Sequence, residues 1–366
     1  MDKLNLFGAI PPEIANFTRL KKLSMERNLL SGPFPVELGR LGFLTFLNIG
    51  INQLSDRLPP ELGNLTNLEM LFIGNNRFSG AIPAEIGHLT LLSQLHVDGS
   101  GFSGEIPKEL GQLTKLQNLW MFGNNFHGQI PNVFENMSNF GQLYLYGNEN
   151  LSGPIPSSIF SLGSLMQLSI GDLSNGGNIP LNLKSLVKLT YLSLRHNGLG
   201  GTIPEDMGSL NQLQYLDLSF NKLTGRMPTS FSSLTSLSSL FLGSNNLEGN
   251  LDVLEELSNL KIFDSMADKG KDKLRVEESS SSTRRHRRET AAADTQFMAS
   301  ARTARAPRPS MTAEEQEKND LFTAQLMSMM GTFEQLAKNP RMQKLLKTKD
   351  YRTGSQAETS QQATSR

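Results

Sequence analysis

The side chains in this sequence that could support acid–base or metal chemistry are few and widely spread. The five histidines are His88, His96, His127, His196 and His286. Only His96 and Asp98 have the spacing of two that places both side chains on one face of a strand, and no third ligand follows them. Because a zinc site uses at least three protein ligands, we expect no metal site and no cofactor.

Motifs for covalent or phosphoryl-transfer catalysis are missing as well. The chain has no cysteine, so it has no thiol nucleophile, thiolate metal site or disulfide. It contains no G-x-S-x-G elbow, no glycine-rich phosphate loop and no kinase-type catalytic loop. The adjacent carboxylates Glu205-Asp206 and Glu255-Glu256 lie where polar residues of the convex side are expected, so we interpret them as solvated surface. The sequence therefore predicts a non-enzymatic protein.

A repeat of 24 residues must position the remaining candidate residues. An apolar residue marks each unit, with one spacing of 25 at Glu149-Asn150: Leu20, Leu44, Leu68, Leu92, Leu116, Phe140, Leu165, Leu189, Leu213 and Leu237. A proline keeps the same spacing, at Pro11, Pro35, Pro59, Pro83, Pro107, Pro131, Pro156, Pro180, Pro204 and Pro228. One such unit cannot bury its leucines alone, so the repeat indicates a stacked solenoid with a shared core.

Each unit follows the pattern L-x-x-L-x-L-x-x-N-x-L-x-G-x-I-P, and its parts have distinct physical roles. The L-x-L alternation predicts a short strand with one buried face, so we expect Leu194 in the core and Ser193 facing solvent. The asparagine can satisfy backbone groups at the turn after the strand. The glycine permits an unusual backbone conformation, and Ile-Pro favours an extended segment. Ser100 and Leu173 depart from the asparagine position.

The pattern resembles the plant extracellular class of leucine-rich repeats, whose mark is L-x-G-x-I-P. The sequence looks like the ectodomain of a plant leucine-rich-repeat receptor-like kinase over about residues 1–263. Stretches 216–225 and 170–174 are similar to the subgroup that carries a malectin-like domain. The resemblance implies an α/β solenoid over residues 1–265, a curved right-handed superhelix of ten to eleven repeats.

Several features of that family are missing from the sequence. No signal peptide, cysteine-bearing cap, malectin-like domain, membrane helix or kinase occurs, and the first repeat begins at Leu4. We therefore expect a truncated or rearranged member. Without a cap, the first repeat should present an unpaired strand edge and expose Leu6, Ile10 and Ile14, so its N-terminus should fray or associate.

The repeat stops at residue 265, and the composition then changes. Residues 266–311 are polar and basic, and residues 348–366 are polar, so we expect disorder in both. The run Arg284–Arg288 is interpreted as a solvated linker, with a nuclear-localisation or nucleic-acid patch as the alternative. Residues 1–265 carry a net charge of −6 and residues 266–366 one of +6. No nucleic-acid partner is expected.

Residues 312–347 carry a helical pattern. Thr312 to Glu315 fit a capping box. An apolar stripe follows at helical spacing, formed by Phe322, Leu326, Met329, Met330, Phe333 and Leu336. Two interpretations stay open: a helix that binds a partner, or a helix that docks on its own chain or is marginal in solution.

A candidate binding face can be derived from the strand alternation. The residues beside the two inner leucines should point outward, onto the concave side of the sheet. They include Phe46, Phe72, His96, Asp98, Trp120, Phe122, Tyr144, Tyr146, Tyr191, Arg195, Tyr215, Asp217 and Phe241. Aromatic residues can cover a sheet without any ligand, yet Trp, Tyr and Arg are enriched at interface hot spots. We therefore expect a ligand's apolar anchor at Trp120, Phe122, Tyr144 and Tyr146. Tyr191, Arg195, Tyr215 and Asp217 should form a more polar cluster.

Four N-x-[ST] sequons, at Asn16, Asn64, Asn136 and Asn150, fall outside this face and are candidate glycosylation sites. By resemblance, the chain would bind a protein or peptide on the concave face at the plant cell surface, with a possible co-receptor. One alternative is a secreted inhibitor of glycan-degrading enzymes. Another is a cytoplasmic scaffold that uses residues 312–347 to bind a partner.

Overall fold

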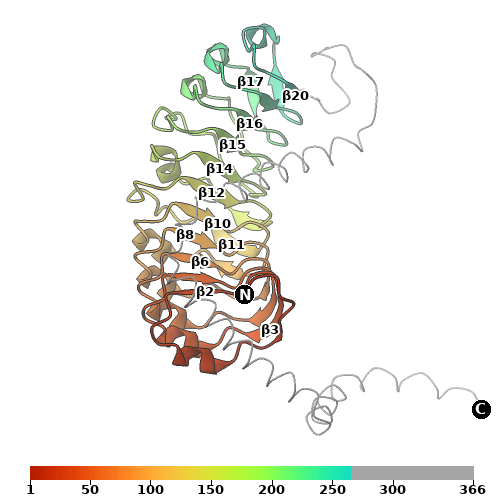
Figure 1. Cartoon of the computed structure of the whole chain (residues 1–366). Helices are drawn as coiled ribbons and strands as arrows, with labels where there is room; N and C mark the ends of the chain where they lie inside the picture. The colour runs from red at the N-terminus through yellow and green to blue at the C-terminus, as the bar shows by residue number, and fades with distance from the viewer. Residues whose placement is uncertain (265–366) are drawn as a thin grey trace, which may run out of the picture. The chain divides into compact units, whose positions relative to one another are not determined.

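Each unit folds into one turn of a column because the two leucines of L-x-L need a neighbouring turn to cover them. The computed structural model describes residues 1–264, and these turns stack into a curved column (Figure 1). One strand per turn joins a parallel sheet of eleven strands, called the long sheet below. In spatial order they are β2 (Lys22–Ser24), β4 (Phe46–Asn48), β6 (Met70–Phe72), β8 (Gln94–His96), β10 (Asn118–Trp120), β12 (Gln142–Leu145), β14 (Gln167–Ile170), β15 (Tyr191–Ser193), β16 (Tyr215–Asp217), β18 (Ser239–Phe241) and β20 (Ile262–Asp264).

The register of the long sheet places equivalent residues of successive turns side by side. Leu71 pairs with Leu95, which pairs with Leu119, and all three are buried. Leu194 is fully buried, as the alternation predicts. The expectation for Ser193 is wrong, because this residue is only 5% exposed. It lies between Ser169 and Asp217 on the adjacent strands, and side chains crowd together on this side of a curved sheet.

A second strand in most turns forms smaller sheets in an outer layer. One sheet contains β1 (Phe7–Gly8), β3 (Leu29–Pro33), β5 (Gln53–Asp56) and β7 (Arg77–Phe78). A second contains β9 (Ser103–Glu105), β11 (Asn125–Gln129) and β13 (Asn150–Ser152), and a third pairs β17 (Thr224–Arg226) with β19 (Asn246–Glu248). The glycine that precedes Ile-Pro has a positive φ, as at Gly104 with 82°. Asp56 takes that place once, with a φ of 68°.

Short 3-10 helices close most turns. They are η1 (Pro12–Asn16), η2 (Val36–Arg40), η3 (Pro60–Asn64), η4 (Ala84–His88), η5 (Lys108–Gln112), η6 (Ser157–Ser161), η7 (Glu205–Ser209), η8 (Thr229–Ser233) and η9 (Asp252–Leu254). The repeated proline precedes the first helical residue in an extended conformation, as at Pro107 with φ −65° and ψ 128°. A side chain at Gly63 would place its Cβ 2.6 Å from the Glu85 carbonyl oxygen, so glycine allows η3 to lie against η4.

The repeated asparagine satisfies backbone groups at the turn after its strand, as the sequence predicts, and it also bonds to the preceding turn of the column. The Asn221 amide nitrogen donates to the carbonyls of Leu194 and Leu218, both at 2.9 Å. Its amide oxygen accepts from the backbone nitrogens of Asn197 and Leu199, both at 3.0 Å. Because Asn221 is buried, each of these bonds pairs a group that water does not reach.

The first turn is better covered than the sequence predicts. Leu6, Ile10 and Ile14 are 8%, 3% and 0% exposed, so the expectation that they are exposed is wrong. The preceding residues lie against the second turn, where Asp2 Oδ1 accepts from Ser24 Oγ at 2.6 Å and from the backbone nitrogen of Glu26 at 3.0 Å. These contacts close the end of the column, although β2 remains the edge strand of the long sheet.

Within residues 1–264, no helix has the length and apolar character needed to cross a membrane. The expectations for segments 266–311, 312–347 and 348–366 lie outside the described residues.

Candidate binding face of the long sheet

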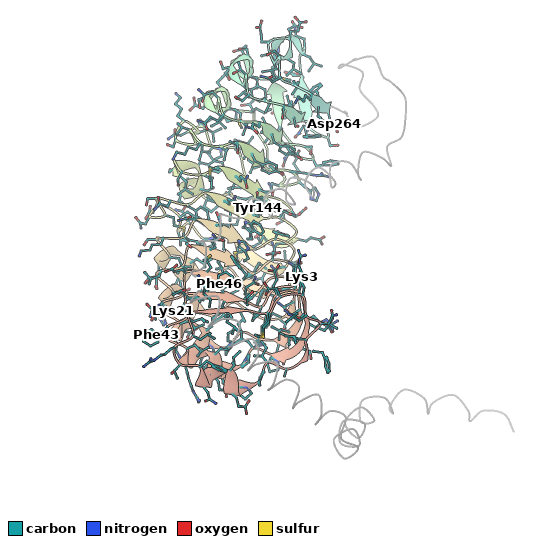
Figure 2. The ribbon with its side chains drawn as sticks, in the orientation of Figure 1. Lys3, Lys21, Phe43, Phe46, Tyr144 and Asp264 are labelled. Atoms are coloured by element: carbon teal, nitrogen blue, oxygen red, sulfur yellow. The ribbon has the colours of Figure 1, made fainter. Side chains whose placement is uncertain are left out.

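The side chains that alternate with the buried leucines lie on the opposite side of the long sheet. This side lines the concave side of the column, and we call it the concave face; Phe46 and Tyr144 mark two points on it in Figure 2. The register aligns Phe72 with His96, His96 with Trp120, and Trp120 with Tyr144. The structure therefore brings these sequence-predicted residues into one line across adjacent strands.

Aromatic rings from five successive strands contact one another, and we call this chain of contacts the ring ladder. Phe46 joins it diagonally, because Phe46 is in register with Met70 and not with Phe72. Phe46 and Phe72 have ring centroids 5.7 Å apart, and Phe72 and His96 have theirs 4.4 Å apart. His96 stacks on Trp120 at 4.0 Å with an interplanar angle of 3°, and Trp120 meets Tyr144 edge-on at 5.6 Å. The ladder is thus continuous from β4 to β12.

A second pair of rings lies beside the ring ladder, two residues farther along each strand's chain than Trp120 and Tyr144. Phe122 and Tyr146 stack at 5.0 Å with an interplanar angle of 7°, and Phe122 also lies 6.4 Å from Trp120. Beyond β14, Tyr191 stacks on Tyr215 at 4.4 Å. The outward residues of β14 are Gln167 and Ser169, which carry no ring, so this strand separates two aromatic groups.

Several of these rings are more covered than the sequence predicts. Trp120 and Tyr144 are 6% and 1% exposed, and Tyr191, Tyr215 and Phe241 are also buried. Phe72, Phe122 and Tyr146 are half-buried. The expectation that these rings face solvent is therefore wrong for the five buried rings. Rings on strands ~4.8 Å apart stack on each other across a curved sheet.

The two carboxylates predicted on this face are held by nearby polar groups. Asp98 Oδ2 accepts from Asn75 Nδ2 at 2.7 Å. Asp217 Oδ1 accepts from the backbone nitrogen of Ser219 at 2.9 Å and from its hydroxyl at 2.6 Å. Both carboxylates are buried, so their hydrogen bonds hold neighbouring groups of the face in place.

A polar cluster lies at the rim of the face, beside the rings of Tyr191 and Tyr215. The Arg195 guanidinium lies 4.8 Å from the ring centre of Phe220. His196 Nδ1 lies 2.8 Å from Asp172 Oδ1, and Asp172 Oδ2 accepts from the backbone nitrogen of Gly147 at 2.8 Å. Sequence reasoning included Arg195 but missed the other three residues. Their signal was available, because Asp172, His196 and Phe220 all occupy the place directly before the asparagine position.

A row of amides on the same face was also missed. Gln94, Asn118, Gln142 and Gln167 are aligned on four adjacent strands, and all are half-buried. Trp120 Nε1 donates to Gln142 Oε1 at 3.3 Å, and the Tyr144 hydroxyl donates to Gln167 Oε1 at 2.5 Å. We call these four residues the amide row. They begin four successive strands, so the repeat spacing carried a signal for them in the sequence.

The four sequons lie away from the concave face. Asn16 and Asn64 end the helices η1 and η3, Asn136 lies in the turn before β12, and Asn150 begins β13. All four residues are exposed. Among the described residues, no three histidine or acidic side chains lie together in a way that could hold a metal ion.

Comparison with known families identifies the repeat. Residues 9–153 match the family described as leucine-rich repeat region, and residues 187–247 match leucine rich repeat. The two matches together span more than half of the chain. The chain is a leucine-rich-repeat protein.

Solved structures similar to this leucine-rich-repeat solenoid include plant receptors. The PEPR1–AtPEP1 structure is 29% identical with a TM-score of 0.65, over 72% of this chain and 41% of that one. A TDR receptor is 31% identical with a TM-score of 0.66, over 72% and 50%. The ectodomain of the membrane receptor kinase GASSHO1/SCHENGEN3 from Arabidopsis thaliana, in complex with CASPARIAN STRIP INTEGRITY FACTOR 2, is 32% identical with a TM-score of 0.58, over 73% and 38%.

This leucine-rich-repeat chain spans half or less of the length of those three receptor structures. The comparison with curated proteins gave no match.

Proposed function

We propose that this leucine-rich-repeat protein binds a polypeptide ligand on its concave face and has no catalytic role. The observation that carries the proposal is the concentration of rings, amides and an arginine on one face. The ring ladder, the amide row and the cluster around Arg195 together span β4 to β16. Aromatic and arginine side chains are enriched at protein-binding hot spots.

The likeness to receptor ectodomains supports the same proposal. Two of the similar structures, those of PEPR1 and GASSHO1/SCHENGEN3, are complexes with AtPEP1 and CASPARIAN STRIP INTEGRITY FACTOR 2. By analogy, we propose that this solenoid senses a ligand outside the cell, as part of plant cell-surface signalling with a co-receptor. Exposed sequons such as Asn16 and Asn64 would carry glycans in that setting.

The experiment uses a display library of random linear peptides, selected on the immobilised full chain. Calorimetry then measures the Kd of a selected peptide for the variants Phe122→Ala and Arg195→Ala. Both side chains lie on the concave face and are only half-buried, so their truncation should weaken binding about tenfold or more. For both variants, the free energy of unfolding in urea should change little compared with the loss of binding.

Phe43→Ala is the matched control for this experiment. Phe43 is 60% exposed and lies at the edge of the column, away from Phe46 and Tyr144 (Figure 2). Its truncation should leave the Kd unchanged. A library that yields no specific binder, or a binder sensitive to Phe43→Ala and indifferent to Phe122→Ala and Arg195→Ala, would refute the proposed site.

A further inference from the structure

The amide row differs from the rings around it in its unused hydrogen-bonding capacity. The side-chain amides of Gln94 and Asn118 make no hydrogen bond within the described residues, and Gln142 and Gln167 use only their oxygens. Each side-chain amide can donate two hydrogen bonds. Four adjacent strands therefore carry unused amide donors in one line.

The ring ladder fixes the direction in which two of these donors point. An indole N–H can only donate, so its bond at 3.3 Å places Gln142 Oε1 toward Trp120 and turns Nε2 away from it. The Tyr144 hydroxyl donates to Gln167 Oε1 at 2.5 Å, and this bond likewise leaves Gln167 Nε2 on the side away from Tyr144. Trp120 and Tyr144 each lie one turn before the glutamine that they hold. The same relation is thus repeated in consecutive turns.

We propose that the amide row holds the main chain of an extended polypeptide ligand through its carbonyl oxygens. Trp120 and Tyr144 then act as positioning residues that orient the donors, and they are not themselves the apolar anchor. This assignment also accounts for their burial. It deepens the proposed function and rests on it.

The geometry fits a short stretch of extended chain. Four strands at a spacing of ~4.8 Å give the row a length of about 14 Å, which an extended polypeptide covers with about four residues at ~3.3 Å each. The ligand's carbonyls would complement the donors, whereas its side chains would extend toward half-buried Phe122 and Tyr146. Because main-chain carbonyls occur at every residue, the row supplies affinity with little dependence on ligand sequence.

A polysaccharide fits this face less well. Sugar rings stack on open aromatic faces, but His96 and Trp120 already cover each other at 4.0 Å. Trp120 and Tyr144 are also almost completely buried. The observations therefore favour a polypeptide, and oligosaccharide binding is one of the outcomes to be tested.

The test uses the full chain and a peptide selected from the random library. Gln142→Ala and Gln167→Ala should each weaken binding by about fivefold, since one net hydrogen bond contributes about 1 kcal/mol. Gln112→Ala, an exposed glutamine in η5 on another side of the column, is the matched control and should leave the Kd unchanged. Thermal unfolding of each variant checks that the solenoid remains folded.

A double-mutant cycle tests the positioning role of Trp120. Trp120→Phe keeps an aromatic ring but removes the N–H group that orients Gln142. It should weaken binding about as much as Gln142→Ala does, and the double variant should be no weaker than either single variant. Additive losses would overturn the positioning role.

Ester replacements in the peptide test the contact with main-chain carbonyls. An ester has a weaker carbonyl acceptor than an amide, so at least one replacement should weaken binding to the wild type. The same replacement should have no effect on the variant that lacks Gln142 and Gln167. If the Phe122 and Arg195 variants lose binding while the glutamine variants do not, the amide-row inference fails and the proposed function stands. No specific peptide binding at all, or binding only of a neutral oligosaccharide, would overturn both.

Discussion

The two sides of the long sheet come from the same strands but differ in how strictly the residue type is repeated from turn to turn. On the buried side, the same leucine recurs in nearly every turn, as in Leu71, Leu95 and Leu119, because each must fit between two equivalent neighbours. On the concave side, the aligned residues change from phenylalanine through histidine and tryptophan to serine and aspartate. Packing between turns fixes the residue type on the first side and constrains it less on the second.

The largest expected effect contrasts the two sides within one strand. Leu194→Ala should lower the free energy of unfolding by about 2–5 kcal/mol, because it opens a cavity between turns. Ser193→Ala should change the free energy of unfolding by less than about 1 kcal/mol. Ser193 is buried, but its replacement by alanine removes only one small hydroxyl group. Urea unfolding of both variants measures the difference. Equal losses would mean that packing also fixes the concave side.

The asparagine position tests the turns between the two sides. Asn221→Ala should cost about 2–3 kcal/mol in urea unfolding, because it leaves buried backbone groups of two turns without partners. The matched control is Asn211→Ala, at an exposed position, which should stay within about 0.5 kcal/mol. A loss at Asn221 no larger than at Asn211 would contradict the structural role of this position.

Ile51 is a place where the repeat tolerates backbone strain. Its φ of 57° is unfavourable for a β-branched residue, and its side chain is 37% exposed. Ile51→Gly should therefore raise the free energy of unfolding by about 0.5–1 kcal/mol. Ile51→Ala keeps the strained conformation and serves as the control without such a gain. A glycine variant that is less stable than the wild type would show that the contacts of the Ile51 side chain outweigh its backbone strain.

The smallest effect concerns acid sensitivity at η7, on the surface of the column. Backbone hydrogen bonding by Ser230 is the main cause that holds the pKa of Glu205 below its ordinary value of 4.5. Because the folded pKa is depressed, Glu205 contributes stability above pH 4.5, and this is lost as the pH falls through the lower folded value. Glu205→Gln should lower Tm slightly at pH 7 and progressively less toward pH 3. Glu61→Gln, at the second residue of η3, is the control. A Glu205→Gln deficit that grows toward pH 3 would contradict this sign.

Periodicity made the buried side predictable. The spacing of 24 gave the strands, the core leucines such as Leu194, and the asparagine that bonds the turns together. It also placed the candidate residues on one face in the correct register, including Trp120 beside Tyr144. These features depend on local sequence repeated many times, so no long-range contact had to be known in advance.

Curvature and side-chain direction were not predictable in this way. The burial of Trp120 and Ser193 depends on neighbours one turn away, whose side chains the alternation places but does not orient. The residues before Leu6 lie against the second turn through hydrogen bonds of Asp2, which lies ahead of the first repeat. The spacing of the amide row was present in the sequence, but the bond that orients Gln142 toward Trp120 was not predictable from it.

The fluorescence of Trp120 tests the central claim most directly, because this is the only tryptophan in the chain and it lies on the concave face. A library-selected peptide is titrated into the full chain, and the tryptophan emission is followed alongside calorimetry. If the peptide binds on the concave face, the emission should change and saturate with the Kd found by calorimetry. Tight binding by calorimetry with no change in Trp120 emission would place the ligand elsewhere and contradict the account.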